Sequence, residues 1–91
     1  MANTLITTRM ILMEFTRRLQ NAGVSGVPSV ELRHLPDQAY ELTLRTGEWH
    51  TDAKFDASAL EWSILDFGDR LIAPSVSLFQ RSQVGVLEGA T

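Results

Sequence analysis

The sequence predicts a small α+β domain in which a helix, three antiparallel β-strands and a second helix follow one another, with an extended C-terminal arm or edge strand. Three observations indicate this. Apolar residues recur at helical spacing before residue 23, they alternate with polar residues between residues 30 and 55, and helical spacing returns after residue 57. With 91 residues, the chain is expected to form a single domain spanning residues 1–91. We expect its core within about residues 4–73 and the arm at residues 74–91.

The first predicted helix begins at residue 4 or 8 and ends at residue 22. Leu12, Phe15, Leu19 and Ala22 recur at spacings of three and four residues, as one face of a helix requires. Gly23 follows as a natural stop, since glycine readily adopts the left-handed backbone conformation that ends many helices.

The same helix carries more apolar surface than one stripe, because Met10 and Met13 lie beside it. This excess is compatible with core packing or with a docking face, so Met10, Met13 and Arg17 are candidate partner contacts. On the opposite face, Glu14 is expected to form an exposed ion pair with Arg17 or Arg18.

The three strands are predicted to form an antiparallel meander with one face in water. Residues 30–34 alternate apolar and polar side chains, residues 35–38 make a turn, and Thr46-Gly47 allows a tight return between the second and third strands. The residues expected to point inward on the last two strands are Tyr40, Leu42, Leu44, Trp49, Thr51, Ala53 and Phe55.

The second helix is predicted from Ser58 to Ala73. Ser58 and Glu61 match a capping box, in which the serine hydroxyl and the glutamate each bind a free backbone N–H at the helix start. Pro74 is expected to end the helix, because a proline disfavours helical geometry in the residue before it.

After Pro74, residues 75–79 are predicted as an edge strand or an extended arm. Such a segment can complete the sheet of its own domain or reach a neighbouring chain, and the sequence leaves both open. The candidate partner contacts in this segment are Val76, Leu78 and Phe79.

Composition excludes several classes of function. The chain has no cysteine, so a disulfide framework, a thiolate metal site and a thiol nucleophile are absent. Eight basic residues against 11 acidic ones give a net charge of −3, and the basic residues are dispersed, which disfavours nucleic-acid binding. No apolar stretch approaches the ~20 residues of a membrane span, and no cofactor-binding motif occurs.

One short segment carries residue types suited to catalysis. Strand alternation places Glu48, His50 and Asp52 on the same face. Successive residues on one strand face lie about 7 Å apart, whereas metal ligands converge from several directions. A solvated strand face is therefore expected, with neither a metal nor a catalytic site, and we do not expect an enzyme.

Acidic side chains concentrate around the start of the second helix, where Asp66 and Asp69 are candidate partner contacts. They form either a solvated helix face or an acidic surface that meets a basic partner.

The order αβββα resembles the double-stranded-RNA-binding domain. That family reads phosphates through a basic cluster at the start of its second helix. Here the corresponding segment opens with Asp56 and contains Glu61, so no direct nucleic-acid binding is expected.

A second resemblance concerns the first 21 residues. The residues that carry it are Met1-Ala2-Asn3-Thr4-Leu5-Ile6-Thr7, Met10-Ile11, Glu14, Arg18-Leu19 and Asn21. They are similar to the opening of major coat proteins from short-tailed phages, which implies a phage-encoded structural protein in the virion or the host cytoplasm. We therefore expect a virion accessory protein for capsid decoration or head-to-tail joining, with self-association or a coat protein as partner.

The alternative is a phage-encoded inhibitor of a host defence or nucleic-acid enzyme. Such a protein would bind a basic host protein through the acidic surface at Asp66 and Asp69.

Overall fold

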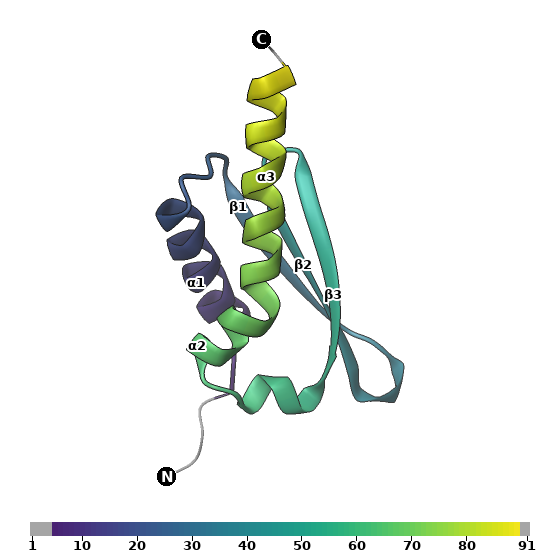
Figure 1. Ribbon diagram of the computed structural model, residues 1–91. Coiled ribbons are helices and arrows are strands. Elements are labelled where there is room, and N and C mark those ends of the chain that lie inside the picture. Colours follow the sequence, from purple (N-terminus) through teal and green to yellow (C-terminus); the bar gives the residue numbers. More distant parts are fainter. Residues whose placement is uncertain (1–4, 90–91) are drawn as a thin grey trace.

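The computed structural model describes residues 5–89, with side chains up to residue 83. It confirms the α+β fold and its order (Figure 1). Helix α1 (Thr8–Asn21) precedes strands β1 (Pro28–His34), β2 (Ala39–Thr46) and β3 (Trp49–Asp56). A helical region follows, made of α2 (Ile64–Phe67), the π-helical turn η3 (Gly68–Ile72) and α3 (Ala73–Gly89). Residues 1–4, which carry part of the coat-protein resemblance, lie outside the described residues.

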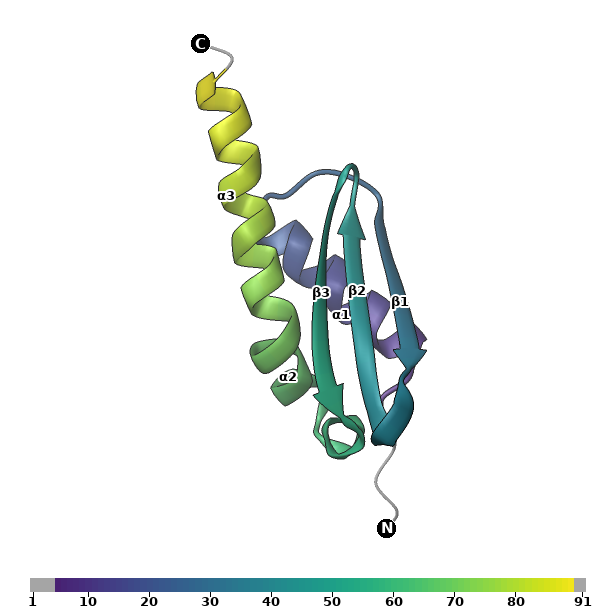
Figure 2. The same cartoon turned by 90° about the vertical axis from the view of Figure 1, so that its right-hand side faces the viewer.

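The sheet is an antiparallel meander in the order β1-β2-β3. Leu42 on β2 pairs with Leu32 on β1 and Ala53 on β3, which puts the three side chains on the same face. Helix α1 crosses this inner face, and α3 runs beside β3 (Figures 1 and 2). The helices leave the opposite face of the sheet uncovered, as the alternating pattern predicts.

The core lies between the inner face and the helices. Phe15 of α1, Phe67 of α2 and Phe79 of α3 are each at most 1% exposed, and the rings of Phe15 and Phe79 lie 6.1 Å apart. Burial of such side chains stabilises a fold by about 1.5–3 kcal/mol each. The buried apolar residues are Ile6, Ile11, Phe15, Leu19, Val24, Leu42, Leu44, Ala59, Phe67, Ile72, Val76 and Phe79.

The prediction of an extended arm after Pro74 was wrong, because residues 73–89 form helix α3. Pro74 does not stop the helix, and Ala73 before it keeps helical angles of −57° and −42°. The wider turn η3 explains this: the Ala73 N–H donates to the Gly68 carbonyl five residues back instead of four. A proline in an α-helix collides with the carbonyl four residues back, and the π turn makes room for the ring.

The expected start of the second helix was also wrong. Residues 57–61 form a short 3₁₀ turn, η2 (Ala57–Glu61), and its cap is Asp56, which accepts a bond from the Ser58 N–H. The α-helix begins after Ser63, whose hydroxyl oxygen accepts a bond from the Asp66 N–H at 3.1 Å. Ser63 therefore performs the capping role that the sequence pattern assigned to Ser58.

This assignment predicts a difference between two serines. We expect Ser63→Ala to lower the free energy of unfolding by about 1 kcal/mol, the usual effect of losing a helix cap. Ser58→Ala keeps the backbone bond to Asp56 and is expected to have a smaller effect. Urea denaturation followed by circular dichroism measures both, and a larger loss at Ser58 would contradict the assignment.

Candidate partner-binding groove

A buried carboxylate organises one flank of α1. Glu14 is 8% exposed, and its two oxygens accept bonds from Arg17 Nε at 2.9 Å and Arg17 Nη2 at 2.6 Å. The second oxygen also accepts a bond from Arg18 Nε at 2.7 Å. The predicted pairing of Glu14 with these arginines is confirmed, but the expectation that the pair is exposed was wrong, because α2 and η3 pack against this helix. Arginines at both i+3 and i+4 from one glutamate are the signal that could have revealed the cluster.

Arg18 links Glu14 on α1 to Asp69 in the second helical region. Its Nη2 donates to Asp69 Oδ1 at 2.7 Å, which ties α1 to η3. Hydrogen bonds from Arg17, reinforced by Arg18 and opposed by burial, hold the pKa of Glu14 below its usual value of 4.5. The carboxylate is therefore charged at neutral pH.

Gly68 leaves room for the Arg18 guanidinium at this crossing. A Cβ atom at this position would lie 2.8 Å from both Nε and Nη2 of Arg18. A side chain at this position would require the Arg18 guanidinium to shift away from η3, so glycine suits the bond between Arg18 and Asp69.

Beside the cluster, a hollow of about 260 Å³ opens between α1 and α2. Met13 is 64% exposed at the border of this hollow. Methionine is flexible and polarizable, so it adapts to partner surfaces of different shapes. The residues that line the hollow are Met10, Met13, Glu14, Arg17 and Ile64.

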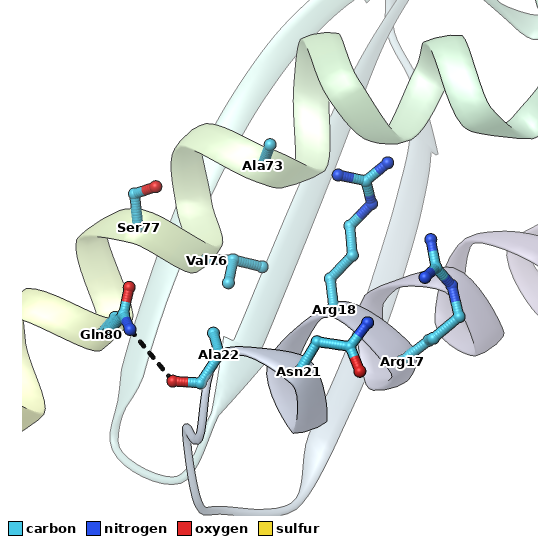
Figure 3. A pocket seen from close by; sticks show the side chains of 8 residues that line it. All are labelled: Arg17, Arg18, Asn21, Ala22, Ala73, Val76, Ser77 and Gln80. Atoms are coloured by element: carbon cyan, nitrogen blue, oxygen red, sulfur yellow. Dashed lines mark hydrogen bonds between the residues drawn. The ribbon is translucent and has the colours of Figure 1, made fainter.

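A second hollow, of about 380 Å³, lies between the C-terminal half of α1 and α3 (Figure 3). One end is closed by Gln80, whose side-chain N–H donates to the Ala22 carbonyl at 3.1 Å. Its lining residues are Arg17, Arg18, Asn21, Ala22, Ala73, Val76, Ser77 and Gln80. Arg17 borders both hollows, and we call the two together the α1 groove.

The structure brings four of the sequence-predicted contacts together in this groove, namely Met10, Met13, Arg17 and Val76. Asp69 lies nearby through its bond to Arg18, and Asp66 is exposed on α2. The groove residues that sequence reasoning did not single out are Ile64 on α2 and, on α3, Ala73, Ser77 and Gln80.

Two predicted contacts belong to the core of this chain. Val76 is 7% exposed and Phe79 is 1% exposed, so both side chains are mostly covered by this chain's own core, although Val76 also lines the second hollow. Leu78 is 45% exposed but lies on another surface, where it lines a hollow between α3 and β3. The helical conformation of residues 73–89 causes this division, because adjacent residues of a helix face different directions.

The segment with catalytic residue types is spread out. Glu48 lies in the turn between β2 and β3, and His50 and Asp52 are exposed on the outer face of β3. Asp52 accepts a bond from the Thr43 hydroxyl at 2.7 Å. Within the described part of the chain, no group of three or more histidine, aspartate or glutamate side chains is placed to hold a metal ion.

Comparison of the chain with protein-family models, curated proteins and solved structures found no match. Over residues 5–89, no helix has the length and apolar character needed to cross a membrane.

Proposed function

We propose that this chain is a protein-interaction module without enzymatic activity, and that it holds a protein partner in the α1 groove. The observation that carries the proposal is Met13, which is 64% exposed and, with the half-buried Met10, borders a hollow beside a fixed pair of arginines. Large exposed apolar side chains next to charged ones are typical of protein interfaces.

We further propose that the partner is a phage coat protein and that the chain is a virion accessory protein, for capsid decoration or head-to-tail joining. The N-terminal resemblance supports this proposal. Four of the residues that carry it, Met10, Glu14, Arg18 and Asn21, line the α1 groove, whereas Ile11 and Leu19 lie in the core.

The groove also defines the chemistry of the partner segment. Its methionine end accepts an apolar side chain. Arg17 uses Nε and Nη2 to bind Glu14, which leaves Nη1 of this half-exposed side chain for an acceptor on the partner. A segment with an apolar residue beside a carboxylate or carbonyl oxygen fits both features.

A charge at the methionine end tests the proposal. We expect Met13→Asp to weaken binding to purified coat-protein shells at least about tenfold, because the partner's apolar side chain would meet a solvated carboxylate. Co-sedimentation of the chain with the shells, over a range of chain concentrations, measures the change.

The matched control is Val27→Asp, which introduces the same charge at an apolar residue that is 82% exposed and lines neither hollow. It is expected to leave binding unchanged. A chain that never sediments with the shells would contradict the coat-protein proposal. Equal binding by both variants would contradict the groove.

A second candidate function is inhibition of a host defence or nucleic-acid enzyme through an acidic surface. It is favoured by Asp66 and Asp69, which are three residues apart and both exposed. Asp66→Arg is the cleaner test, because Asp69→Arg also breaks the bond to Arg18. This function predicts salt-sensitive capture of a basic host protein that Asp66→Arg weakens and Met13→Asp leaves intact.

A further inference from the structure

Strand β1 forms a free margin of the sheet. Among the described residues, β1 pairs only with β2, and in Figure 2 it lies at the edge opposite α3. An edge strand exposes unpaired backbone N–H and C=O groups, which form a template for another strand. This margin is separate from the α1 groove.

The turn between β2 and β3 establishes which backbone groups point outward. Thr46 and Trp49 flank a two-residue turn in which Gly47 has a φ of 60°, so these two residues exchange backbone hydrogen bonds. Because the backbone N–H and C=O groups of successive residues point to opposite sides of a strand, those of the odd-numbered residues of β2 point towards β1. Glu31 and Arg33, which pair with Thr43 and Glu41, therefore form backbone hydrogen bonds with β2. The backbone groups of Val30, Leu32 and His34 point to the free edge.

Two further observations agree with this assignment. The Ala39 carbonyl accepts a bond from the Leu35 N–H at 2.8 Å, so the odd-numbered end of β2 does face β1. Pro28, which has no N–H to donate, occupies an outward-facing position at the start of β1. A proline is tolerated at such a place on an edge strand.

We propose that two copies of the chain pair through their β1 strands, antiparallel, around a two-fold axis at Leu32. In this register Leu32 lies opposite Leu32 of the second copy, and Val30 lies opposite its His34. Each of these residues presents its backbone groups to the other strand, as the pairing requires. The two sheets then continue into one.

Charge selects this register. It places Glu31 of each copy opposite Arg33 of the other, on the outer face of the sheet. Shifting the second strand by two residues in one direction sets Glu31 against Glu31, and in the other direction sets Arg33 against Arg33. Opposite charges across a strand pair stabilise it, and like charges destabilise it.

The side chains are available for these contacts. Glu31 and Arg33 are exposed, and Arg33 already donates to Glu41 at 2.5 Å with 56% of its side chain exposed. In the pair of copies, Arg33 would lie between Glu41 of its own chain and Glu31 of the other. Such a network restrains the arginine more firmly than one exposed ion pair does.

Charge reversal tests the register directly. Analytical ultracentrifugation from about 1 µM to about 1 mM is expected to show a reversible dimer of the unaltered chain. Glu31→Arg places two arginines opposite two arginines, and Arg33→Glu places two glutamates opposite two glutamates. Each variant alone is expected to dimerise at least about tenfold more weakly.

Mixing the two variants gives the decisive result. The Glu31→Arg chain carries arginine at both positions and the Arg33→Glu chain carries glutamate at both, so opposite charges meet twice and a heterodimer is expected from two monomers. The double variant with both reversals restores opposite charges and is expected to dimerise by itself. Asp52→Arg changes charge in the same way as Glu31→Arg but on the outer face of β3, and it is expected to leave the dimer intact.

Circular dichroism melts confirm that each variant is folded. A chain that stays monomeric up to the highest concentration would overturn the proposal, as would a dimer that persists in both single variants. Neither result depends on coat-protein binding, so this proposal and the proposed function fail separately.

Discussion

Phe79→Ala is expected to lower the free energy of unfolding by about 3–5 kcal/mol, which is a large share of the stability of a domain this size. Phe79 is 1% exposed and its ring packs 6.1 Å from that of Phe15. Truncation removes the apolar contact and leaves a cavity between α1 and α3 that the surrounding side chains fill only in part. Urea denaturation followed by circular dichroism, at low protein concentration, measures the loss.

The preceding residue of the same helix is the control. Leu78 is 45% exposed, so Leu78→Ala is expected to cost less than about 1 kcal/mol. An extended arm that reached for a partner would give a different result, because Phe79→Ala would then leave the isolated chain almost as stable as before. Equal, small losses for both variants would therefore contradict the helix.

Much of the fold could be predicted because its signals are local. Alternation along residues 40–44 and 49–55 reports which side chains face the helices, and the structure confirms this from the buried Leu42 and Leu44. On α1 the predicted face was right at Phe15 and Leu19 and wrong at Leu12, which is exposed, because the buried face continues through Ile11 instead. Each pattern arises from the geometry of a single element.

Helix α3 was missed because one local rule outweighed a periodic signal. Ile72, Val76 and Phe79 are spaced by four and three residues, as the buried face of a helix requires, and all three are buried. Pro74 lies between them, and the rule that a proline disfavours helical geometry in the preceding residue predicts that the helix ends there. The π turn that accommodates it leaves no clear mark in the sequence, although its Gly68 is the residue that allows Arg18 to approach.

The candidate site was predicted only on its α1 side. Met10, Met13 and Arg17 are adjacent through helical spacing, which a sequence reveals. Ile64 and Gln80 join them only through the packing of two distant segments, and that depends on how the helical region crosses α1. The burial of Glu14 has the same origin, because it is created by α2 and η3 rather than by α1 itself.

The buried cluster predicts a strong and pH-dependent effect of a single side-chain change. Glu14→Gln is expected to lower the free energy of unfolding by about 2–3 kcal/mol at pH 7, since the amide cannot replace the charged acceptor for both Arg17 and Arg18. Arg18 has only 18% of its side chain exposed, so water replaces the lost bonds incompletely. Asp69→Asn, at a side chain that is 68% exposed, is expected to cost less than about 1 kcal/mol.

The sign of the pH dependence follows from the lowered pKa of Glu14. Its contribution to stability is fully present above the usual value of 4.5 and is lost as the pH falls through the lower pKa of the folded state. The unaltered chain and Glu14→Gln should therefore differ at pH 7 and converge in acid, where the unaltered side chain is also neutral. Denaturation curves at a series of pH values measure the difference, and a difference that stayed constant from neutral to acidic pH would mean that Glu14 does not act through its charge.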